Sequence, residues 1–175
     1  RSFMRVVEAL AAENKEFAEA IQLIFNGEVH PAFYKFVESS PILKPLSYFS
    51  GNIPHRQLLD LYYSSSVLLI VLHGYKDAEG YMPGKLFEYL ATGLPVLGVG
   101  PVIGDAAALL RETGSGQMLE SSDAEGMKVL LLHHFENWKL NLIAPQKNKA
   151  LNYSRQFITG RLVELFESDS NPGTP

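Results

Sequence analysis

Two short runs of apolar residues constrain the fold more than any other feature of this sequence. Residues 67–72 read Val-Leu-Leu-Ile-Val-Leu, and residues 95–99 read Pro-Val-Leu-Gly-Val. Because neither run alternates apolar with polar side chains, each predicts a strand buried on both faces, as in a parallel sheet. Segments with a helical spacing of apolar residues lie beside these runs, at 55–63 and 84–91. Strands that alternate with helices predict an α/β domain with right-handed crossovers.

The same alternation extends over most of the chain. We expect strands at 21–25, 47–49, 67–72, 95–99 and 117–119, and helices at 2–11, after Pro31, at 55–63, 84–91, 106–111, 123–138 and 147–167. Gly160 is expected to bend or divide the last helix. The predicted fold is a doubly wound parallel sheet with helices on both faces, a Rossmann-like domain of residues 1–167 with a C-terminal tail, 168–175. Such a domain normally begins with a strand, so we expect the first strand to lie outside these residues.

Composition and charge exclude several classes of function. With 15 Lys+Arg and 19 Asp+Glu the net charge is −4, so we expect no nucleic-acid partner, and phosphate binding requires a local site. The sequence has no cysteine, which excludes disulfides, thiolate metal sites and a cysteine nucleophile. No metal site is predicted, because adjacent residues such as His133 and His134 point in different directions from a helix. We expect a cytoplasmic domain without a signal peptide or membrane span, since the aliphatic run 67–72 is too short to cross a bilayer.

Residues 82–96, Met-Pro-Gly-Lys-Leu-Phe-Glu-Tyr-Leu-Ala-Thr-Gly-Leu-Pro-Val, contain the strongest chemical signal. Pro83 and Gly84 begin a helix after a buried strand, where free amides and the helix dipole can hold a phosphate. Lys85 adds a mobile cation. Glu88 lies on roughly the same helix face and can accept two hydrogen bonds from ribose hydroxyls. The alternative is that Lys85 and Glu88 form an ordinary surface ion pair of small energetic value.

Three segments together resemble the donor-binding half of GT-B glycosyltransferases, specifically the family-4-like retaining enzymes. Residues 51–55, Gly-Asn-Ile-Pro-His, resemble the family's Gly-x-Val/Ile-Pro-His segment before a helix, and residues 65–69 resemble its next strand. Residues 85–96 resemble its Lys-Leu-Phe-Glu-Tyr-x-Ala-x-Gly-x-Pro-Val signature. The resemblance covers most of residues 1–120. It implies a domain that binds a UDP- or GDP-linked sugar, in an enzyme that transfers the sugar to a hydroxyl acceptor in cell-envelope or capsular polysaccharide synthesis.

The resemblance also implies roles for single residues. Glu88 matches the second Glu of the family's Glu-x7-Glu motif, which holds the ribose. The first Glu would fall at position 80, where this chain has Gly80, and Glu79 is its candidate substitute; Lys85 and Glu79 are thus the candidate catalytic residues. The residues placed at the diphosphate are Gly84, Lys85 and Leu86. Ile53 matches the region that meets the nucleobase, and Arg1 is placed near the basic residue of the family's first loop.

The resemblance implies partners as well. These are an N-terminal acceptor domain of the same protein, which these residues do not include, the nucleotide sugar, and a lipid-linked or oligosaccharide acceptor; no separate cofactor is expected. The acceptor domain would bring the protein to the inner face of the membrane. Without that domain we expect nucleotide binding but poor sugar transfer.

Two alternatives stay open at this point. One is a nucleotide-sugar epimerase of the same architecture, which would release epimerised sugar without any acceptor. The other is a non-enzymatic doubly wound interaction module, which would bind no nucleoside diphosphate and would be indifferent to Glu88→Ala.

Overall fold

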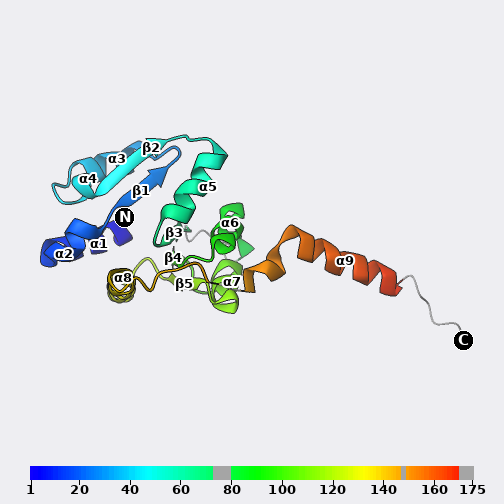
Figure 1. Cartoon of the computed structure of the whole chain (residues 1–175). Helices are drawn as coiled ribbons and strands as arrows, with labels where there is room; N and C mark the ends of the chain where they lie inside the picture. Colours follow the sequence, from blue (N-terminus) through cyan, green and yellow to red (C-terminus); the bar gives the residue numbers. More distant parts are fainter. Residues whose placement is uncertain (73–79, 147–148, 170–175) are drawn as a thin grey trace, which may run out of the picture.

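The computed structural model describes residues 1–72, 80–146 and 149–169, and it shows a mixed α/β fold (Figure 1). The elements in chain order are α1 (Ser2–Glu13), α2 (Lys15–Ala20), β1 (Leu23–Asn26), α3 (Pro31–Glu38), α4 (Leu43–Leu46), β2 (Ser47–Gly51), α5 (His55–Ser64), β3 (Leu68–Val71), α6 (Gly84–Thr92), β4 (Val96–Val99), α7 (Asp105–Thr113), β5 (Gly116–Leu119), α8 (Ala124–Lys139), a 3₁₀ helix (Lys149–Tyr153) and α9 (Arg155–Asp169). The strand–helix alternation predicted from the sequence is confirmed.

The described strands form two parallel sheets. β1 pairs with β2, with Leu23 opposite Ser47. β4 lies between β3 and β5, and Val96 faces Leu68 on one side and Gly116 on the other. The predicted parallel α/β class is confirmed, but in the described residues the strands are divided between a two-stranded and a three-stranded sheet.

Two hydrophobic clusters cover the faces of these sheets. The first core combines α1, α2, α3, α4 and α8 with side chains from both sheets; its fully buried members are Val7, Val37, Leu43, Leu97 and Met127. The second core combines α5, α6 and α7 with the three-stranded sheet; its fully buried members are Ile70, Leu86, Leu90, Val96 and Leu110. In β3, Leu68 and Ile70 belong to the second core while Leu69 packs against the first. This strand therefore has apolar contacts on both faces, as its unbroken apolar run predicts.

The helices differ from the prediction in two respects: two short helices were not expected, and the C-terminal helix is broken at another residue than predicted. α2 and α4 were not expected, because both are too short to show a clear helical period. α9 continues through Gly160, so the expected division there is wrong. The break falls at Ser154, whose hydroxyl accepts a hydrogen bond from the backbone N–H of Phe157 at 3.2 Å. A single glycine costs a helix only about 1 kcal/mol, whereas a serine hydroxyl can cap a new helix start.

The C-terminal helix α9 projects away from the sheets (Figure 1). It extends to Asp169, which lies within the segment predicted as a tail, and residues 170–175 are outside the described part of the chain. Among the helices that the structure describes, none combines the length and the apolar composition that crossing a lipid bilayer requires.

Candidate functional site at the carboxyl ends of the strands

The N-termini of α5 and α6 meet at the carboxyl ends of the strands. α5 begins at His55, shortly after β2 ends, and α6 begins at Gly84, in the connection that follows β3. The imidazole Nε2 of His55 lies 3.3 Å from Oε1 of Glu88. Since β2 and β3 belong to different sheets, this contact shows that both sheets direct their carboxyl ends to one edge.

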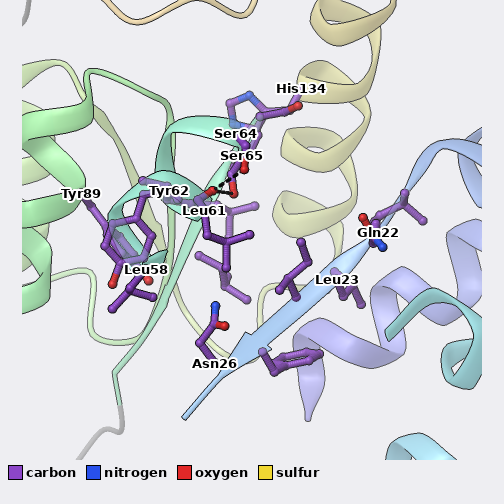
Figure 2. A pocket seen from close by; sticks show the side chains of 18 of the residues that line it. Gln22, Leu23, Asn26, Leu58, Leu61, Tyr62, Ser64, Ser65, Tyr89 and His134 are labelled. Carbon is purple, nitrogen blue, oxygen red and sulfur yellow. Dashed lines mark hydrogen bonds between the residues drawn. The ribbon is translucent and has the colours of Figure 1, made fainter. Parts of the chain in front are cut away.

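A pocket of about 880 Å³ opens at this edge and continues between the two sheets (Figure 2). The residues that line its opening are Asn26, Gly27, Asn52, Ile53, His55, Lys85 and Glu88. Deeper in, Figure 2 shows Leu58 and Leu61 of α5 on one side and Leu23 of β1 on the other. A polar rim over an apolar interior is typical of ligand pockets.

Three of the predicted site residues lie together at this opening. Glu88, Lys85 and Ile53 all line the pocket. The side chain of Glu88 is 38% exposed, so its carboxylate is accessible from solvent. Within the described residues the side-chain partner of Glu88 is the imidazole of His55 on α5, and no ion pair between Glu88 and Lys85 is formed. The alternative of an ordinary Lys85–Glu88 surface pair is therefore not what the structure shows.

Gly84 and Leu86, which were predicted at the diphosphate, lie in the first turn of α6 and are not part of the pocket lining. Pro83 is the N-cap of α6, and no side chain caps this helix. The N–H of Leu86 donates to the carbonyl of Pro83 at 2.9 Å, and the Leu86 side chain is fully buried in the second core. In the described structure the amides of Gly84 and Lys85 have no such partner, so these two N–H groups and the Lys85 ammonium are the donors that face solvent.

The remaining predicted residues are not brought to the pocket. Arg1 donates from Nη2 to the carbonyl of Ala32 at 3.2 Å, and its guanidinium lies 5.7 Å from the centre of the Phe36 ring. Arg1 is not part of the pocket lining, so the structure does not join it to Glu88. Glu79 lies outside the described residues.

Two tyrosines, Tyr62 of α5 and Tyr89 of α6, lie close enough to Glu88 to interact with its charge. The rings of Tyr62 and Tyr89 meet edge to face, with centroids 4.9 Å apart. Burial raises the pKa of Tyr89 to about 12, with smaller contributions from Tyr62 and from the charge of Glu88. Burial likewise raises the pKa of Tyr62. Both phenols therefore remain protonated at neutral pH, and the pocket wall beside Glu88 carries no further negative charge.

Sequence reasoning did not find the contact between His55 and Glu88. Glu88 was predicted as a site residue and His55 belongs to the segment 51–55, but the two are 33 positions apart and nothing in the sequence pairs them. The sequence did contain one signal for this contact: α5 and α6 each follow a strand, and helices that begin at the carboxyl edge of parallel strands can lie close together.

The far end of the pocket contains a second histidine. His134 of α8 lines it, and its Nδ1 atom is buried without a hydrogen-bond partner in the described structure. Burial lowers the pKa of His134, so its neutral form is favoured. In the parts of the chain that are described, no group of three or more His, Asp or Glu residues is arranged to hold a metal ion.

Comparison with known proteins does not identify a family for this chain. No protein-family model matches it, and no curated protein gives a significant match. Interpretation of the site therefore depends on its own geometry.

Proposed function

We propose that this chain is the nucleotide-sugar-binding domain of a retaining glycosyltransferase of GT-B architecture. The proposal depends on one observation: Lys85, Glu88 and His55 meet at the carboxyl edge of parallel strands, around the opening of a pocket. Ligands of parallel α/β sheets bind at this edge.

The nucleotide would bind along the first turns of α6. The amides of Gly84 and Lys85, the Lys85 ammonium and the positive end of the helix dipole would hold the diphosphate. Glu88 lies about one helical turn further on, roughly 5 Å along the axis. That separation suits a carboxylate that accepts hydrogen bonds from ribose hydroxyls while the amides hold the diphosphate. Ile53 lines the same opening, where its backbone can meet the base.

The same donors would assist bond cleavage. In sugar transfer the bond between the anomeric carbon and the phosphate oxygen breaks, and negative charge develops on the departing diphosphate. Preorganised amides and a lysine stabilise such charge. The acceptor hydroxyl and the groups that exclude water would come from a separate acceptor domain, so this chain alone is expected to bind donor without rapid transfer. A lipid-linked or oligosaccharide acceptor in envelope polysaccharide synthesis fits this chemistry.

Calorimetric titration with UDP, GDP and ADP tests the proposal. We expect at least one of them to bind, and Lys85→Ala and Glu88→Ala to weaken its binding. Lys35→Ala and Glu125→Ala are matched controls, because both side chains are exposed and lie outside the pocket lining. If none of the three nucleotides bound, the proposal would be wrong, and an interaction module without nucleotide would be favoured.

A further inference from the structure

The pocket between the sheets is bordered by two strand edges. Among the described strands, β1 is paired on one side with β2, β3 is paired on one side with β4, and the other edge of each has no strand partner. Residues of both strands line the pocket from opposite sides. On one side these are Gln22 and the whole of β1, and on the other Val67, which precedes β3, with Leu68, Leu69 and Val71 of β3. We call this space the inter-sheet groove. Among the described residues, no strand lies in it.

The backbone of β3 directs alternate peptide groups into the groove. The N–H groups of Leu68 and Leu72 donate to carbonyls of Pro95 and Val99, at 2.9 and 2.8 Å. Adjacent residues of a parallel strand direct their peptide groups to opposite sides, so the N–H groups of Leu69 and Val71 point away from β4 and into the groove. Val71 is 45% exposed and Ile24 of β1 is 36% exposed, so both strands that border the groove carry a large apolar side chain that solvent reaches.

The strands that border the groove run in the same direction. In Figure 2, Gln22, at the start of β1, and Ser64 and Ser65, which precede β3, lie above Asn26, the last residue of β1. At the opposite end the contact between His55 and Glu88 joins the carboxyl ends of the two sheets. The groove is thus bordered by two parallel edges that start and end together.

The handedness of the chain indicates what lies between these edges. α3 and α4 connect β1 to β2 over the face of the first core. α1 and α2 pack in the same core and lead into β1. Because crossovers between parallel strands are right-handed, helices on this face must enter β1 from the side away from β2. That side is the inter-sheet groove.

We propose that the inter-sheet groove receives one further β-strand, parallel to β1 and β3, from a segment joined to the N-terminus of α1. The added strand would turn the two sheets into one, in the order β2, β1, added strand, β3, β4, β5. A small molecule would leave two rows of backbone groups unpaired, whereas an extended chain pairs with both. Phe3 of α1 lines the same groove, so a short connection reaches it.

The walls of the groove define the chemistry of this strand. One of its faces would pack on the first core, beside Phe3 and Leu97, and the other on Leu58, Leu61 and Tyr62 of α5. Since both walls are apolar, the strand should be a continuous run of β-branched and aliphatic residues rather than an alternating one.

Amide hydrogen exchange of the 175-residue chain is the first test. We expect the amides of Leu69 and Val71 to exchange about tenfold or more faster than those of Leu68 and Leu72, because only the latter pair has partners. Equal protection of all four amides would overturn the proposal. So would protection that rises with protein concentration together with dimer formation, since a second copy would then fill the groove.

The second test fuses a strand to the chain. A Val/Ile-rich segment of about five residues, the usual strand length, is joined ahead of Arg1 through a short Gly-Ser linker. The control carries proline at alternate positions of this segment, which removes the N–H donors. We expect the fused strand to slow exchange at Leu69 and Val71 by about tenfold relative to the proline control. Equal exchange in the two fusions would overturn the proposal, and this result is independent of whether a nucleotide binds.

Discussion

Replacing Glu88 by Gln is expected to weaken nucleoside diphosphate binding by about 1–2 kcal/mol, or roughly 5- to 30-fold in Kd. A hydrogen bond to a charged group contributes about 1.5–3 kcal/mol. The lower part of that range applies because the Glu88 side chain is 38% exposed and solvent screens its charge. The contact with His55, whose side chain is 65% exposed, adds little to the free energy of unfolding, so the variant should fold normally.

A thermodynamic cycle distinguishes a ribose contact from a general effect. Calorimetry would compare Glu88→Gln with the parent for a ribonucleoside diphosphate and for its 2′,3′-dideoxy analogue. If Glu88 accepts from the ribose hydroxyls, the substitution should cost little with the dideoxy ligand, because the two changes remove the same interaction. An equal loss of affinity for both ligands would refute the assignment. Thermal unfolding of both proteins provides the control for structural damage.

Three further substitutions test other parts of the structure. Lys85→Ala should weaken diphosphate binding by an amount that shrinks as salt is added, while binding of the nucleoside alone, measured by the same calorimetry, stays unchanged. Burial lowers the pKa of His134. The contribution of its neutral form to the free energy of unfolding is therefore complete above pH about 6.5 and is lost as the pH falls towards the folded-state pKa. In His134→Gln the free energy of unfolding, measured with urea, should depend less on pH in this range. Gly93→Ala should lower the free energy of unfolding by more than Gly114→Ala. Both have positive φ, 72° and 67°, but only at Gly93 would a Cβ meet backbone, 2.6 Å from the Gln146 carbonyl oxygen. If urea unfolding gave equal decreases in the free energy of unfolding for the two variants, the backbone near Gly93 would have moved to accommodate the added Cβ, and the expectation would be wrong.

The parts of the fold that could be predicted are those fixed by local periodicity. The apolar run 67–72 predicts β3, because a strand that is buried on both faces can be identified from its own unbroken run of apolar residues. Gly93 predicts the end of α6 because the chain there adopts a left-handed conformation, at φ 72°. The separation of the strands into two sheets could not be predicted, since strand order depends on packing between distant segments. α4 was missed for a local reason, since a four-residue helix that contains Pro45 shows no period.

In the candidate site, too, the residues with a local sequence signal could be predicted, whereas the contact between distant residues could not. Lys85 and Glu88 could be found from the sequence, because a helix start after a buried strand has defined chemistry. The contact between His55 and Glu88 could not be predicted, because it joins residues that are 33 positions apart on two separate helices. Arg1 was placed by resemblance at a position that depends on the chain before it, and in the structure its guanidinium lies over the Phe36 ring of α3 instead.

The position of the pocket and the position of the groove follow from one property of the chain. The helices that lead to β1 and β2 lie on the face of the first core, whereas α5, α6 and α7 lie on that of the second. With the proposed strand in place, the chain would wind outwards in two directions from the groove, because right-handed crossovers place helices on opposite faces only in that arrangement. At such a point the connections after neighbouring strands diverge, and the space that they leave at the carboxyl ends admits a ligand. Gly27 and Lys85 lie on opposite sides of this opening. A strand in the groove would end between them, so its following turn would become part of the wall beside the proposed diphosphate site.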